Sequence, residues 1–147
     1  MNFKLNFELV PDGCWYSNLR TILSKAQWNF IREDAISRAE GKCAICGKKC
    51  TRFDVHERWD YDEQNGVQIL KDILAICKDC HSVIHIGFTQ LKSKNIERYE
   101  NHFMKVNNCN YATYCKALST ANEIHQRRNL ISEWKLNLDY LKRYIKE

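Results

Sequence analysis

Two pairs of cysteines at metal-ligand spacing are the first residues of this sequence that could do chemistry. Cys43 and Cys46 form one C-x-x-C pair, and Cys77 and Cys80 form a second. A tight turn at this spacing places two thiolates on one side of a tetrahedral ion, and two such turns complete a four-sulfur shell. The sequence therefore predicts one structural Zn²⁺ at these four cysteines. Four unrelated core cysteines, or a shell that uses Cys50 in place of Cys46, are the alternatives.

Three histidines form a second candidate group close to these cysteines. His81 directly follows the last cysteine, and His85 lies four residues further on. In a helix over residues 79–86 these two side chains share a face, so both imidazoles can reach one ion. His56 lies on a predicted strand, "RFDVHERW", whose apolar residues face away from it. The pattern predicts a three-nitrogen metal site with open positions for water and phosphate. Histidines that only cap the cysteine site, or lie at the surface, are the alternative.

Strands at the two ends of the chain are predicted to support these groups. Residues 3–10 alternate between apolar and polar side chains until Pro11, and residues 134–140 alternate in the same way. Both stretches therefore predict half-buried strands. Because one strand alone can neither bury its face nor pair its backbone groups, we predict that the two strands pair with each other.

Helices are predicted between these strands and the central segment. Ser24 and Gln27 have the spacing of a capping box, and Gly41 is placed to end the helix that follows them. Asn110 is a candidate N-cap for a helix further along. The apolar periodicity predicts helices over residues 14–23, 24–39, 94–107 and 111–131.

The predicted fold class is α+β, and a chain of 147 residues fits a single domain. Residues 43–88 form its metal-binding core, and residues 1–42 and 89–147 are strand and helix extensions. No apolar run approaches the roughly 20 residues of a membrane span, so we expect no membrane partner. The first ten residues lack the apolar core of a signal peptide. We therefore expect an intracellular, cytoplasmic protein, in which eight cysteines indicate metal binding rather than a disulfide scaffold.

The central segment resembles the HNH endonucleases. The resemblance rests on C-x-x-C, an apolar strand ending in His56, and the run "CKDCHSVIH" about twenty residues later, and it covers residues 43–88. It implies a ββα-metal fold and metal-dependent hydrolysis of phosphodiester bonds, with DNA as the substrate. It also implies that His56, His81 and His85 bind a second divalent ion, which could be Mg²⁺, Mn²⁺, Ni²⁺ or Zn²⁺.

Two positions depart from the pattern of that family. Glu57 stands where the family has its general-base histidine, and Asp72 stands where it has an asparagine. Glu57 can act as the base if burial raises its pKa, but it can also bind the metal or fix another side chain. The catalytic candidates are therefore His56, Glu57 and Asp72.

The extra carboxylates keep a second function open. They repel an incoming phosphate, so the alternative is a catalytically silent, zinc-scaffolded module that binds a protein or nucleic acid, such as an inhibitor or adaptor from a mobile element. The net charge of +5 is compatible with either reading. Basic side chains could hold phosphates, or form an ordinary solvated helix face, in "GKKC" (47–50) and at Lys92, Lys94, Arg98, Arg127 and Arg128.

Overall fold

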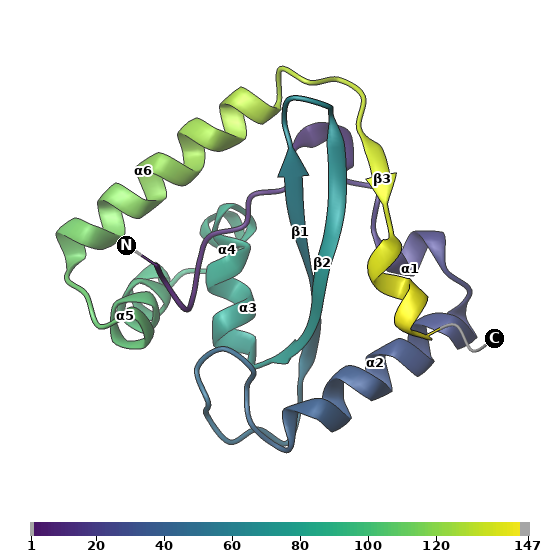
Figure 1. The fold of residues 1–147 in the computed structure, drawn as a ribbon. Coiled ribbons are helices and arrows are strands. Elements are labelled where there is room, and N and C mark those ends of the chain that lie inside the picture. Colours follow the sequence, from purple (N-terminus) through teal and green to yellow (C-terminus); the bar gives the residue numbers. More distant parts are fainter. Residues whose placement is uncertain (1, 145–147) are drawn as a thin grey trace.

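The computed structural model describes residues 2–144, and it contains one three-stranded sheet with helices around it (Figure 1). The elements follow in the order η1 (Asp12–Cys14), α1 (Leu19–Ile22), α2 (Lys25–Ala39), β1 (Asp54–Asp62), β2 (Val67–Ile76), α3 (Lys78–Ile84), α4 (Ile86–Lys92), α5 (Ile96–Asn107), α6 (Tyr111–Arg128), β3 (Lys135–Asn137) and η2 (Asp139–Tyr144). The α+β class predicted from the sequence is confirmed.

An antiparallel hairpin of β1 and β2 forms the centre of the molecule. Its register changes after Arg58 pairs with Asp72, so that Trp59 pairs with Leu70 and Lys71 has no partner in the ladder. This bulge has a clear consequence for packing. Leu70 and Ile73 lie three residues apart, a spacing that would place them on opposite faces of a regular strand. With the bulge between them, both pack into the same core.

Two cores lie on the two sides of this hairpin. The first, the α3-side core, includes Ile76, Val83 and Phe103. The second, the α2-side core, includes Trp28 and Ile73. Figure 1 shows α3, α4, α5 and α6 on one side of the hairpin, and α1, α2 and η2 on the other. Because α3 begins directly after β2, the sequence β1–β2–α3 forms one continuous unit within these layers.

The predicted pairing of the two terminal strands is wrong. The N-terminal segment (residues 3–10) forms no strand. Its apolar side chains pack on helices instead, and the ring of Phe7 stacks on that of Phe103 with a centroid distance of 4.8 Å. Within residues 134–140, only β3 is a strand, and it pairs in parallel with β2. The physical reason is that β2 has a free edge for β3, whereas the phenylalanines bury their rings against α5 and α6.

The helices predicted from the sequence agree better with the structure than the predicted terminal strands do, because capping residues close in the chain set where a helix begins. Ser24 and Gln27 form the predicted capping box at the start of α2. Asn110 caps α6 by accepting the Thr113 N–H, although this helix ends at Arg128 rather than at residue 131. The single helix predicted over residues 14–23 is replaced by the two short helices η1 and α1.

Candidate metal centres

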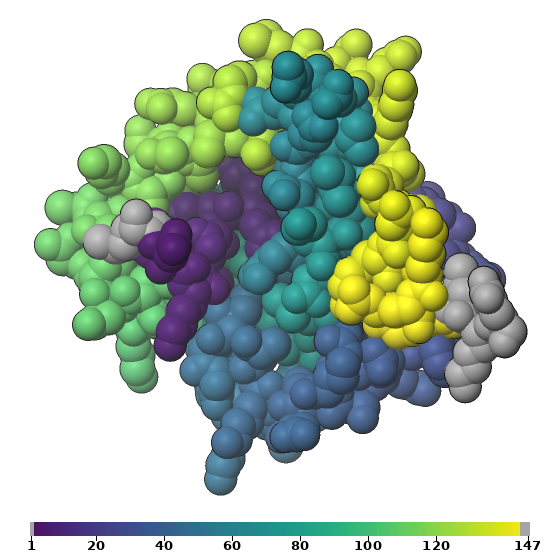
Figure 2. Space-filling model, viewed as in Figure 1, coloured from purple at the N-terminus to yellow at the C-terminus, as the bar shows by residue number. Residues whose placement is uncertain are grey.

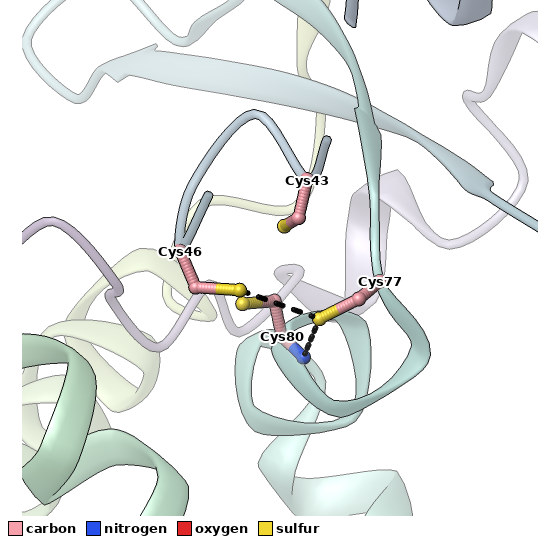
Figure 3. Close-up of side chains that lie close together, drawn as sticks. All are labelled: Cys43, Cys46, Cys77 and Cys80. Atoms are coloured by element: carbon pink, nitrogen blue, oxygen red, sulfur yellow. Dashed lines mark hydrogen bonds between the residues drawn. The ribbon is translucent and has the colours of Figure 1, made fainter. Parts of the chain in front are cut away.

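The four cysteines of the two C-x-x-C pairs converge on one point. Their ligand atoms all lie within 4.8 Å of one another, and we call this group the cysteine cluster. Cys43 and Cys46 come from the loop before β1, whereas Cys77 and Cys80 come from the start of α3. Figure 3 shows the four side chains directed into the space between that loop and the helix. The cluster therefore joins the two ends of the β1–β2 hairpin.

Local hydrogen bonds hold each pair in this geometry. Cys77 is the N-cap of α3, and its Sγ accepts the Cys80 N–H at 3.4 Å. In the loop, the Cys43 Sγ accepts the Ile45 N–H at the same distance. Gly47 has a φ of 77°, a left-handed conformation that lets the loop turn back on itself. Both turns thus present their sulfurs on one side, as a tetrahedral ion requires.

The electrostatics of the cysteine cluster favour a cation. Hydrogen bonds with Cys77 and Cys80 lower the pKa of the Cys43 thiol. The bond with Cys43, together with burial, raises the pKa of Cys77 to about 12. Without a cation, ionisation of one sulfur opposes ionisation of its neighbours. A metal ion removes this opposition, and an S₄ donor set fits Zn²⁺ or iron. Cys50 lies outside the cluster and donates its S–H to the Lys48 carbonyl.

The structure also brings together the three histidines singled out in the sequence. The ligand atoms of His56, His81 and His85 lie within 4.8 Å of one another, and we call them the histidine cluster. The backbone bond from the His85 N–H to the His81 carbonyl preserves helical spacing between them, although His85 is the C-cap of α3. His56 is only 5% exposed and faces them from β1.

The environment of the histidine cluster suits a metal ion. Burial lowers the pKa of His81 and lowers that of His85 to about 4, so both rings are neutral at pH 7. Neutral imidazole is the form that binds metals. The His81 Nδ1 lies 2.9 Å from an Asp54 oxygen, which can hold that ring in one tautomer and leave Nε2 free. These three histidines are therefore a group that could hold a metal ion.

Glu8 belongs to this site, and sequence reasoning missed it. Its Oε1 lies 3.2 Å from the His56 Nε2. The sequence placed Glu8 only on the polar side of a predicted strand. Its position depends on how the N-terminal segment docks, and no local pattern in the sequence signals that docking.

The remaining catalytic candidates separate in space. The Glu57 carboxylate accepts the backbone N–H of Leu19, at the start of α1. Burial raises the pKa of Glu57, partly opposed by that hydrogen bond. Asp72 accepts a hydrogen bond from the Tyr140 hydroxyl at 3.1 Å and does not line the cavity that contains His56 and Glu57. Glu57 thus lines the same cavity as the histidines, with its carboxylate bonded to Leu19, whereas Asp72 lies apart from that cavity.

A cavity of about 880 Å³ adjoins the histidine cluster. It extends along β1 between the N-terminal segment and one face of α6, and Figure 2 shows that segment, in purple, lying between the hairpin and α6. The charged and imidazole side chains that line it around the histidine cluster are Glu8, Arg20, His56, Glu57, His81 and His85. Three of the predicted phosphate-binding residues are paired with carboxylates. Arg98 contacts Asp79, and both Arg127 and Arg128 contact Glu63.

Comparisons with known proteins give one distant similarity. The chain is 29% identical over 90 residues to the F(420)H(2) dehydrogenase subunit O of Methanosarcina mazei. The match covers 60% of this chain and 66% of the length of that relative. No family model matches the sequence, and no solved structure matches the fold. In the part of the chain that the structure describes, no helix is long and apolar enough to cross a membrane. Fold and sites together define an α+β protein with a four-cysteine cluster that can hold a metal ion.

Proposed function

We propose that this chain is a metal-dependent endonuclease of the HNH type that hydrolyses phosphodiester bonds in DNA. The observation that carries the proposal is the β1–β2–α3 unit, in which His56, His81 and His85 face one cavity beside a four-cysteine cluster. Three protein ligands leave coordination positions open, which distinguishes a catalytic site from a closed structural one.

The two clusters have different proposed roles, one structural and one catalytic. The cysteine cluster ties the loop before β1 to the start of α3, so its role is to fix the positions of the strand and helix that carry the histidines. A divalent ion at the histidine cluster would polarise a phosphoryl oxygen and lower the pKa of a bound water. Arg20, exposed at the same cavity, supplies a cation for a phosphate.

Glu57 is the proposed proton acceptor. A carboxylate with an ordinary pKa near 4.3 is a weak base toward water at neutral pH. Burial raises the pKa of Glu57 and so makes it a stronger base than an exposed glutamate. The Leu19 N–H fixes the orientation of its carboxylate in the same cavity as the histidines.

One observation favours the silent, zinc-scaffolded module as a second candidate. Glu8 and Asp54 contact the histidine cluster, and Glu57 lines the cavity beside it. Three carboxylates at one site repel a phosphodiester. Such a module would keep the cysteine cluster and use its helices to bind a protein or nucleic acid.

A cleavage assay separates these candidates. Wild-type protein is incubated with plasmid DNA and Mg²⁺, Mn²⁺, Ni²⁺ or Zn²⁺, beside a His56→Ala variant that keeps the cysteine cluster. Nicking by the wild type, and none by His56→Ala, supports the nuclease. No cleavage with any of the four ions supports the silent module. Elemental analysis of the same protein distinguishes zinc from iron, because a donor set of four sulfurs fits either ion.

Glu57→Gln tests the assignment of the base. Glutamine keeps the shape and can still accept the Leu19 N–H, but it cannot take a proton from water. We expect an unchanged fold and metal content, and a cleavage rate lower by about 10²–10⁴-fold. Equal cleavage rates in Glu57→Gln and wild type would contradict the assignment. Cleavage that emerges only in Glu57→His would identify the natural protein as silent.

A further inference from the structure

Through one residue, the N-terminal segment contacts both the helix and the strand that carry the histidine cluster. The Glu8 backbone N–H donates to the Ile84 carbonyl at 2.9 Å, directly before His85 in the chain. The Glu8 side chain reaches across to His56, with 3.2 Å between Oε1 and Nε2. The segment is also anchored closer to its N-terminus, because Asn107 accepts the Leu5 N–H and donates to the Leu5 carbonyl. Glu8 therefore bridges the helix and the strand that carry the three histidines.

Glu8 and Asp54 stand in the same relation to two different histidines. Each places a carboxylate on one ring nitrogen, Asp54 on the His81 Nδ1 and Glu8 on the His56 Nε2. Histidines that bind metals usually donate their second ring N–H to such a carboxylate, which fixes the tautomer and the ring orientation. An N–H at the His56 Nε2 leaves the Nδ1 lone pair of that ring for an ion.

The second oxygen of Glu8 gives independent support. Its Oε2 is buried without a hydrogen-bond partner, and the nearest cation is the Arg58 Nε at 3.6 Å. The side chain as a whole is 21% exposed, and the ring of His56 is 5% exposed. A buried carboxylate oxygen without a hydrogen bond is unfavourable unless positive charge lies nearby. Arg58 supplies part of that charge through this ion pair, and a divalent ion at the histidine cluster would add to it.

We propose that Glu8 is a positioning residue of the histidine cluster: it orients His56 from the N-terminal segment, so that docking of this segment and binding of a divalent ion stabilise each other. Such coupling is reciprocal, because each event must favour the other by the same free energy. The inference shares the second ion with the proposed nuclease but does not depend on cleavage.

Titration calorimetry with Ni²⁺ tests the first half of this coupling. Full-length protein is first loaded with zinc at the cysteine cluster, and Ni²⁺ is used because imidazole ligands suit it. We expect Glu8→Ala to weaken Ni²⁺ binding by about 10–100-fold, which is the usual effect of removing a group that hydrogen-bonds to a metal-binding histidine. We expect a smaller loss for Glu8→Gln, which keeps the shape and an acceptor. Asp12→Asn removes the same charge from an exposed site of the same region and should bind as the wild type does.

Hydrogen exchange tests the second half, with a readout that a purely structural role would not change. Ni²⁺ should slow amide exchange across residues 3–10 in the wild type, and this response should be lost in Glu8→Ala. The inference is overturned if Ni²⁺ leaves exchange in the wild-type segment unchanged, if Glu8→Ala binds Ni²⁺ as tightly as the wild type, or if the wild type binds no Ni²⁺ at all. Because no arm measures cleavage, failure of the nuclease proposal leaves this test intact.

Discussion

At the scale of single residues, His102 contacts the cysteine cluster from outside it. Its Nε2 lies 3.2 Å from the Cys80 Sγ, and it reaches there from α5. An N–H donated to a metal-bound thiolate stabilises the charge on the sulfur and orients the ligand. The spacing of cysteines in the sequence gives no hint of this contact, because residues 80 and 102 lie on different helices.

We predict that His102→Ala lowers zinc affinity by about 10–100-fold while the four cysteines remain in place. Competition with a chromophoric chelator measures this directly. Asn101→Ala is the matched control, since Asn101 is the exposed neighbour on the same helix. Equal zinc affinity in His102→Ala and the control would show that the contact does not support the metal.

At the scale of elements, α2 supports the hairpin through a locally encoded start. Ser24 accepts the Gln27 N–H, and the Gln27 side chain accepts the Ser24 N–H. Beyond this capping box, Trp28, Ile31 and Ala35 face the hairpin at helical spacing and are buried. The cap therefore fixes where the helix begins, and the apolar stripe fixes which side of it packs.

We predict that Ser24→Ala lowers the free energy of unfolding by about 1 kcal/mol, because it leaves the Gln27 N–H without its partner. Urea unfolding of the zinc-loaded protein measures this change. Ser37→Ala, at an exposed position inside the same helix, should be neutral or slightly stabilising, since alanine is the better helix former there. Equal losses in both variants would mean that the cap does not contribute.

At the scale of the whole molecule, the cysteine cluster joins segments that are far apart in the chain. It connects the loop between α2 and β1 to the junction of β2 and α3. It also forms part of the α3-side core, which includes Leu5 of the N-terminal segment and Phe103 of α5. Loss of the ion should therefore affect much more than the loop that holds two of its ligands.

We predict that a strong chelator, or the variant Cys80→Ser, abolishes the cooperative unfolding transition of this protein, because metal binding at such a site is folding free energy. Near-ultraviolet circular dichroism and thermal melting follow the loss, and added Zn²⁺ should restore the chelated wild type but not the variant. A melting curve that is the same with and without chelator would contradict this prediction.

The sequence by itself determined the features that depend on residues close together in the chain. The C-x-x-C turns, the i,i+4 spacing of His81 and His85, and the capping box of α2 are all set within about one helical turn, where spacing fixes geometry. The strand that carries His56 could also be predicted, because its alternation of apolar and polar residues is typical of a half-buried strand. These local rules were sufficient to predict both candidate metal centres.

Tertiary structure alone decided the contacts between distant segments. Alternation in residues 3–10 predicted a strand, yet alternation does not specify a partner, and the apolar side chains of this segment pack on α5 and α6 instead. That docking brings Glu8 to His56, as the path of α5 brings His102 to Cys80. Asp72 is the opposite case, because the sequence predicted it at the catalytic site, whereas the structure shows it accepting a hydrogen bond from the Tyr140 hydroxyl. Non-directional hydrophobic burial selects among such arrangements over the whole chain, so spacing along the sequence cannot encode them.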